Sequence, residues 1–86
     1  MYQVEFTKRA VKDIENLRAG KLIEKAKRLV EIIKQNPFQT PPPYEKLLGD
    51  LKGTYSRRLN IQHRLVYQVY EDEQVIKIIR MWTHYE

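Results

Sequence analysis

The chain has 86 residues, enough for one small domain and no second one. Hydrophobic residues make up 42% of it, which excludes a disordered tail, and the absence of cysteine excludes disulfides and thiolate chemistry. Sixteen basic and eleven acidic residues leave a net charge of +5, which favours a polyanionic partner. With only two histidines we expect no metal site and no cofactor. No apolar run exceeds three residues and no leader pattern is visible, so we expect a cytoplasmic protein.

The N-terminal half predicts one strand followed by two helices. Residues 2–6 alternate between apolar and polar types, as a strand does. Thr7 offers a hydroxyl N-cap to a first helix, and Gly20 stands where that helix ends. A second helix is expected from about Lys21 until Pro37 stops it, with an amphipathic stripe of Leu22, Ile23, Ala26, Leu29, Val30 and Ile33. The proline-rich residues 36–44 predict a stiff, extended connection.

The C-terminal half predicts three strands, over residues 55–61, 63–70 and 75–83. The acidic residues 71–74 are expected to form the turn of a hairpin between the last two. The whole chain, residues 1–86, is therefore expected to be a single α+β domain of order β-α-α-β-β-β. Its mainly antiparallel sheet would carry the N-terminal helical pair on one face and many of the arginines on the other.

Residues 46–64 hold five basic residues and one acidic residue, and two tyrosines lie in or beside this stretch. Cations bind phosphates and aromatic rings stack on bases, so the pattern favours a nucleic acid. A solvated strand face is the alternative. The candidate RNA-binding residues are Lys46, Lys52, Tyr55, Arg57 and Arg58.

The C-terminal half also contains a carboxylate, histidines and arginines that could together cleave a phosphodiester without a metal. One group would take a proton from the nucleophile and another would protonate the leaving oxygen, while arginine stabilises charge on the phosphate. In RNA the 2′-OH is itself a nucleophile. Composition and spacing alone leave a basic α+β domain, with RNA binding as one option.

Four segments together resemble the YoeB/Txe toxins of bacterial toxin–antitoxin modules, within the RelE superfamily. They are the runs YEKLLGDLKG at 44–53, YSRRL at 55–59, HRLVY at 63–67 and WTHY at 82–85. The resemblance covers nearly the whole chain. It implies a RelE-like fold and a ribosome-dependent endoribonuclease that cuts mRNA and stops translation. It also implies a YefM-like antitoxin as partner and, by analogy, a homodimer.

The resemblance assigns catalytic roles to four residues. Glu45 matches the general base for the 2′-OH, Arg64 the arginine that stabilises the phosphate, and His84 the general acid. Tyr85 matches the tyrosine that helps to place the scissile nucleotide. Arg57 and Arg58 match an arginine pair, to which we assign RNA contact.

Two features depart from the family pattern. Glu86 follows a His-Tyr pair that often ends the chain, and Lys46 stands where a proline can follow the glutamate. The alternatives are a ParE-like toxin, which has the same fold but targets DNA gyrase, and a non-catalytic RNA-binding module.

Overall fold

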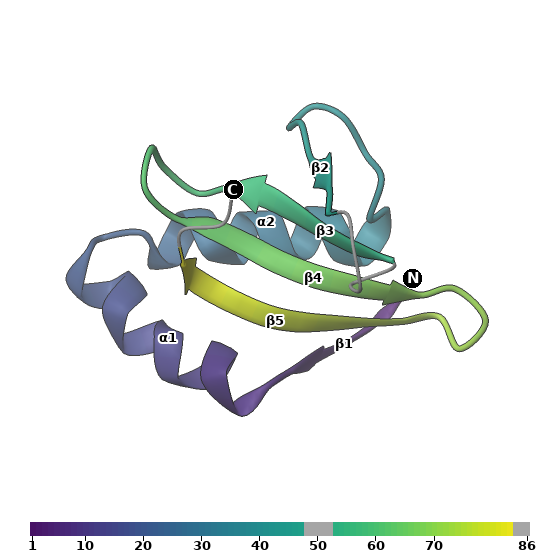
Figure 1. Cartoon of the computed structure of the whole chain (residues 1–86), viewed down its shortest axis with the longest axis horizontal. Coiled ribbons are helices and arrows are strands. Elements are labelled where there is room, and N and C mark those ends of the chain that lie inside the picture. Colours follow the sequence, from purple (N-terminus) through teal and green to yellow (C-terminus); the bar gives the residue numbers. More distant parts are fainter. Residues whose placement is uncertain (48–52, 84–86) are drawn as a thin grey trace.

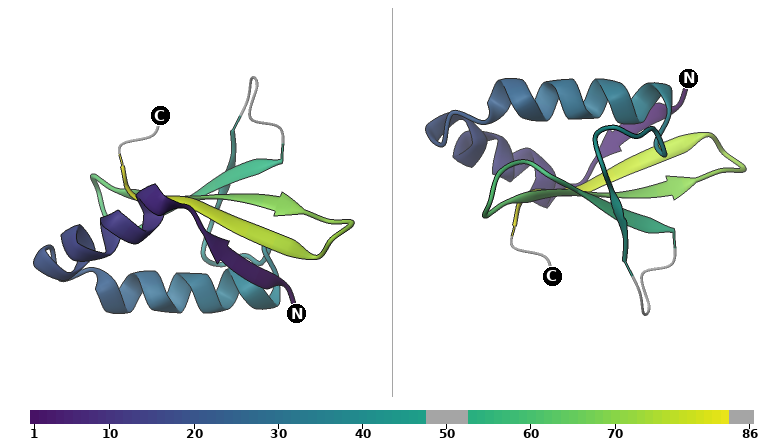
Figure 2. Two further views of the ribbon diagram at one scale, coloured as in Figure 1. Left: turned by 90° about the horizontal axis from the view of Figure 1, so that it is seen from below. Right: turned by 90° about the horizontal axis from the view of Figure 1, so that it is seen from above.

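The computed structural model describes residues 1–47 and 53–83, and in them two helices cover one five-stranded sheet (Figure 1). The sheet order is β1-β5-β4-β3-β2; β1 runs parallel to β5, and the other neighbours are antiparallel. Both helices lie on the same face of the sheet (Figure 2), so the predicted α+β architecture is confirmed. The elements are β1 (Gln3–Phe6), α1 (Lys8–Ala19), α2 (Ile23–Gln35), β2 (Glu45–Lys46), β3 (Thr54–Arg58), β4 (Arg64–Tyr70) and β5 (Val75–Thr83).

The core lies between the helical pair and the central strands. The predicted stripe of α2 supplies buried Ala26, Leu29 and Ile33, while β4 and β5 supply most of the opposing side chains, among them Tyr67 and Ile78. Each fully buried leucine or isoleucine in this core stabilises the fold by about 1.5–3 kcal/mol. Among the described residues, neither helix is long and apolar enough to cross a membrane.

Both ends of α1 are held against β5. Thr7 is the N-cap, as predicted: its hydroxyl accepts a hydrogen bond from the Ala10 amide at 3.1 Å and donates one to the Ile79 carbonyl at 2.8 Å. Gly20 caps the other end with φ −85°, and Lys21 takes the left-handed conformation, with φ 59°. Because a φ of −85° is open to any residue, glycine is needed at position 20 for space and not for its conformation. An added Cβ would lie 2.8 Å from Cη2 of Trp82.

Three details differ from the sequence-based expectation. The two-residue strand β2 was not predicted, and β3 ends at Arg58 rather than Ile61. The side chain of Asn60 accepts hydrogen bonds from the amides of Gln62 and His63, which turns the chain and leaves Ile61 88% exposed. The proline-rich residues 36–44 also form a curved loop instead of an extended connection, because several of their carbonyls converge on one side chain described below.

A buried ion pair fixes α1 to the end of β5. Asp13 is 4% exposed, and its Oδ2 accepts hydrogen bonds from Nε of Arg80 and from the Met81 amide, each at 2.9 Å. Removing one partner of a buried pair leaves an uncompensated charge, so this contact matters more than a surface pair.

We expect Asp13→Asn to lower the free energy of unfolding by about 3 kcal/mol, measured by urea denaturation. Glu24→Gln is the matched control, because Glu24 pairs with Lys27 on the exposed surface of α2 at 3.8 Å. The Glu24→Gln variant should change the free energy of unfolding by no more than about 0.5 kcal/mol. Equal losses in the two variants would contradict a special role for Asp13.

Candidate active site

Three neighbouring strands bring a carboxylate, a hydroxyl and a guanidinium together on the sheet face away from the helices. Glu45 on β2 pairs in register with Ser56 on β3, and Arg64 lies at the start of β4. One terminal nitrogen of Arg64, Nη2, lies 3.0 Å from Oε1 of Glu45, while Nη1 donates to Oγ of Ser56 at 3.1 Å. The structure therefore unites Glu45 and Arg64, two of the four predicted catalytic residues.

The arginine of this site has a second arginine directly opposite. Arg58 on β3 is the cross-strand partner of Arg64, and Arg58 is exposed. Like charges in directly opposed positions of a sheet destabilise it. The Arg58 guanidinium donates to the Ile61 carbonyl at 3.4 Å. A bound anion would offset the repulsion between the two cationic side chains, so the pair is suited to a phosphate.

The end of β5 lies beside the same site. Thr83, the last described residue, pairs with Arg64 across the sheet. His84 is the next residue in the sequence. The predicted catalytic residues His84 and Tyr85, and the predicted RNA-binding residue Lys52, lie outside the described residues.

The predicted position of Arg57 was wrong, because this side chain is buried in the protein rather than exposed on the free face. Arg57 is 1% exposed. Its guanidinium donates to the carbonyls of Pro37 at 3.0 Å and Gln39 at 2.9 Å, to the carbonyl of Pro42, and to the Tyr67 hydroxyl at 3.2 Å. A guanidinium whose nitrogens are occupied in this way has no free face for a phosphate. Arg57 instead holds the loop 36–44 against β3.

The aromatic rings near Arg57 belong to the same packed layer. The Tyr55 ring lies 5.2 Å from Phe38, 5.7 Å from Tyr44 and 5.8 Å from Tyr67, on the face of β3 opposite Ser56. Burial raises the pKa of the Tyr67 phenol, and the charge of Arg57 lowers it by a smaller amount. The phenol thus stays protonated and donates to the Pro37 carbonyl at 2.7 Å.

Tyr55 is therefore half-buried in this cluster, away from Arg64, which corrects its expected place beside the site. Lys46 is exposed, but it pairs in register with Tyr55 and so lies on the other face of β2 from Glu45. Sequence reasoning missed Ser56, although it belongs to the conspicuous Tyr-Ser-Arg-Arg run. Its proximity to Arg64 follows from strand pairing, which no local pattern reports.

The contact between Glu45 and Arg64 is easily opened. The Glu45 side chain is 64% exposed while that of Arg64 is only 14% exposed, and an ion pair whose carboxylate is screened by water contributes about 1 kcal/mol. A phosphate could displace the carboxylate from Arg64 and leave Glu45 free to accept a proton. Across residues 1–47 and 53–83, no three histidine, aspartate or glutamate side chains are grouped as a metal site.

Comparison with known proteins identifies the class. The pattern of the YoeB-like toxins of bacterial type II toxin–antitoxin systems matches residues 6–85. The toxin YoeB of Streptomyces coelicolor is 41% identical over 56 residues, which are 65% of this chain and 67% of that protein. The chain therefore belongs to the YoeB family of type II toxins.

Solved structures agree with this assignment. A YoeB/ParE toxin from Agrobacterium tumefaciens superposes with a TM-score of 0.86 at 30% identity, over 96% of this chain and 99% of that one. Two structures from Staphylococcus aureus are 33% identical. One is a YoeB–YefM complex, with a TM-score of 0.79 and 99% of both chains covered; the other is a YoeB dimer, with a TM-score of 0.82 and 98% of both covered.

We expect Arg57→Lys to destabilise the domain by about 2 kcal/mol or more in urea denaturation, because a single ammonium cannot replace the guanidinium fork among three carbonyls. Its neighbour Arg58 provides the control, since Arg58→Lys is on the surface and should change stability by less than about 0.5 kcal/mol. If Arg57→Lys kept full stability but weakened RNA binding, the buried structural role would be wrong.

Proposed function

We propose that this toxin is a ribosome-dependent mRNA endoribonuclease that acts in the cytoplasm and inhibits translation. The observation that carries the proposal is the cluster of Glu45, Arg64 and Arg58 on adjacent strands, beside the strand end that leads to His84. Membership of the YoeB family supports the same activity.

In the proposed reaction the substrate supplies its own nucleophile. Glu45 accepts the proton of the 2′-OH, whose oxygen attacks the adjacent phosphorus as the bond to the 5′-oxygen breaks. Arg64 and Arg58 stabilise the charge on the phosphate, and Tyr85 helps to place the nucleotide. His84 protonates the departing 5′-oxygen. The products are a 2′,3′-cyclic phosphate, or the 3′-phosphate from its hydrolysis, and a 5′-OH.

The charge distribution supports docking on a large RNA. Residues 8–34 hold nine lysines and arginines and four acidic residues, a net +5 that equals the charge of the whole chain. Most of these basic side chains are exposed, and their two helices lie on the sheet face opposite Glu45 and Arg64. The helical pair can therefore bind ribosomal RNA while the opposite face receives the mRNA.

A YefM-like antitoxin is the proposed protein partner, and a homodimer is the proposed state of the free toxin. The Staphylococcus aureus relatives that form a YoeB–YefM complex and a YoeB dimer support both. An acidic antitoxin segment would compete with RNA for the exposed Arg58 and the partly exposed Arg64, and the exposed basic helices would speed its association at low salt.

We expect His84→Gln to lower the single-turnover rate of mRNA cleavage on purified ribosome complexes by about 10²-fold or more, the usual contribution of a general acid. Thermal unfolding should barely change, because few core contacts depend on a chain terminus. Cleavage should persist in chelator and yield a 5′-OH.

Three results would contradict the proposal. They are an absolute Mg²⁺ requirement of the chemical step, DNA breaks with gyrase in place of mRNA cleavage, and RNA binding without any cleavage. Near wild-type cleavage by His84→Gln would remove only the general-acid assignment.

The helical pair gives a separate prediction. Replacing the exposed Lys21, Lys25 and Arg28 together by glutamine should weaken ribosome binding and flatten its salt dependence, because fewer counterions are released. Cleavage at saturating toxin should stay unchanged. Replacing Glu15, Glu24 and Glu31 by glutamine is the control, which should not weaken binding. An equal loss in both variants would exclude the charge argument.

A further inference from the structure

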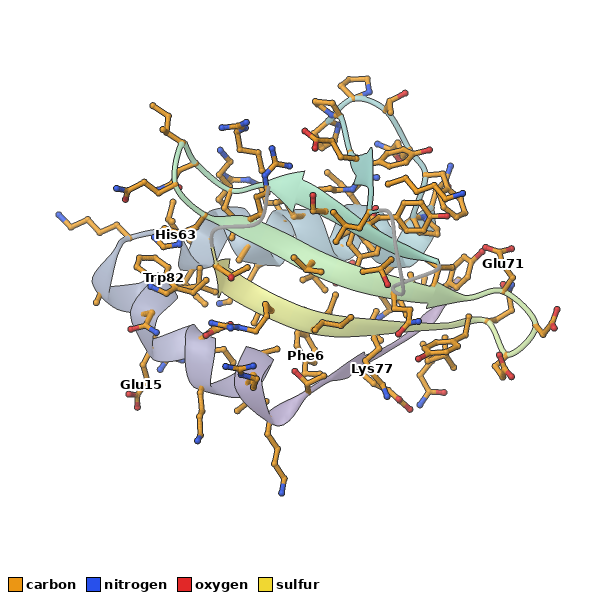
Figure 3. The ribbon with its side chains drawn as sticks, viewed as in Figure 1. Phe6, Glu15, His63, Glu71, Lys77 and Trp82 are labelled. Atoms are coloured by element: carbon orange, nitrogen blue, oxygen red, sulfur yellow. The ribbon has the colours of Figure 1, made fainter. Side chains whose placement is uncertain are left out.

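The single tryptophan of the chain joins three separate parts of the fold. The Trp82 ring, on β5, stacks on the His63 ring with 3.7 Å between centroids and 16° between planes, and Figure 3 shows the two side chains next to each other. The six-membered ring of Trp82 also reaches the turn after α1, where a Cβ on Gly20 would lie 2.8 Å from Cη2 and 2.9 Å from Cζ3. Trp82 thus connects β5 with the turn before β4 and with the helical layer.

Both partners of the stack are firmly held by their own backbone. The Asn60 side chain accepts a hydrogen bond from the His63 amide at 2.7 Å, and the His63 carbonyl accepts one from the Leu59 amide at 2.8 Å. On the other side, Arg80 donates to the Trp82 carbonyl at 3.0 Å while it pairs with the buried Asp13. The stack therefore joins two ordered segments.

The two stacked residues adjoin the candidate active site along the chain. His63 immediately precedes Arg64, and Trp82 precedes His84 by two residues. Arg64 pairs with Thr83, the residue between Trp82 and His84. We propose that the Trp82–His63 stack, seated on Gly20, is a positioning device that fixes the end of β5 relative to Arg64, and thereby the start of the segment that carries the candidate acid His84.

The inference rests on the proposed nuclease function for its effect on cleavage, but the effect on strand geometry is independent of it. A role in core filling alone would make Trp82 replaceable by any apolar side chain of sufficient size. A positioning role requires a planar ring that stacks on His63, because misplacement by about 1 Å can cost about 10²-fold in rate.

The test compares Trp82→Leu, which keeps an apolar side chain, with Trp82→Phe, which keeps a planar ring. Single-turnover cleavage at saturating toxin should fall by about 10-fold or more in Trp82→Leu and stay within about 3-fold of wild type in Trp82→Phe. Ribosome affinity should be unchanged in both. Gly20→Ala, which forces the indole away from its seat, should lower the rate as Trp82→Leu does, with a shift in the fluorescence of the single tryptophan.

Tyr70→Leu is the matched control, because Tyr70 is a half-buried aromatic residue at the opposite end of β4, near Lys77. It should leave the cleavage rate unchanged. Equal rates for wild type and Trp82→Leu, or equal losses in Trp82→Leu and Tyr70→Leu, would overturn the proposal.

A second readout does not need cleavage. The ¹H–¹⁵N heteronuclear NOE of the Thr83 amide should fall in Trp82→Leu, as the strand end becomes mobile on the ps–ns timescale, and stay at the wild-type value in Trp82→Phe and Tyr70→Leu. An unchanged NOE in Trp82→Leu would overturn the proposal whatever the enzyme assay gives. If the wild-type protein does not cleave mRNA and the NOE still falls as expected, the proposed function fails while the positioning of the strand end stands.

Discussion

The burial of Arg57 is the constraint on which the candidate site depends. A guanidinium cannot be deprotonated in a protein, so burying it requires hydrogen-bond acceptors at nearly every nitrogen. Three carbonyls of the loop 36–44 and the Tyr67 hydroxyl meet this requirement. The loop therefore bends around the Arg57 side chain and leads to the edge of the sheet, where β2 begins. Glu45, the first residue of β2, owes its place near Arg64 to this arrangement.

The other side of the site depends on a second buried charge. Asp13 accepts hydrogen bonds from Arg80 and from the Met81 amide, and so fixes α1 against the C-terminal part of β5, just before Trp82 and Thr83. Arg64 lies between β2, whose Glu45 it contacts, and β5, where it pairs with Thr83. Buried contacts thus surround an ion pair whose carboxylate is exposed to solvent.

The basic residues on the two faces of the sheet differ in their surroundings. Arg57 is buried and holds the loop 36–44, whereas Arg58 and Arg64 are the cross-strand pair to which we assign phosphate binding in the proposed function. A second excess of positive charge lies on the helical pair, on the far side of the sheet, in addition to the basic run 46–64, from which the buried Arg57 is withdrawn. In the proposed function, the helical surface would hold ribosomal RNA while the opposite surface acts on the mRNA.

The sequence by itself determined the local elements and the family. Helical periodicity, the Thr7 cap and the acidic hairpin turn each depend on neighbours within a few residues, so both helices and the hairpin strands were predicted closely. The spacing of the four resembling segments was sufficient to indicate a YoeB-like toxin, which the comparisons confirm. The assigned roles of Glu45, Arg64, His84 and Tyr85 stay predictions.

Only the tertiary structure decided which basic residues face solvent and which side chains meet. Arg57 and Arg58 are adjacent and chemically identical, and strand alternation places them on opposite faces without saying which face is covered. Carbonyls of the loop 36–44 decide which of the two is buried, because they accept the hydrogen bonds of Arg57. The strand β2 is too short to show a period and exists because β3 offers it hydrogen bonds. The contacts of Trp82 with His63 and Gly20 join residues far apart in the chain, because packing across the sheet is not encoded in any local pattern.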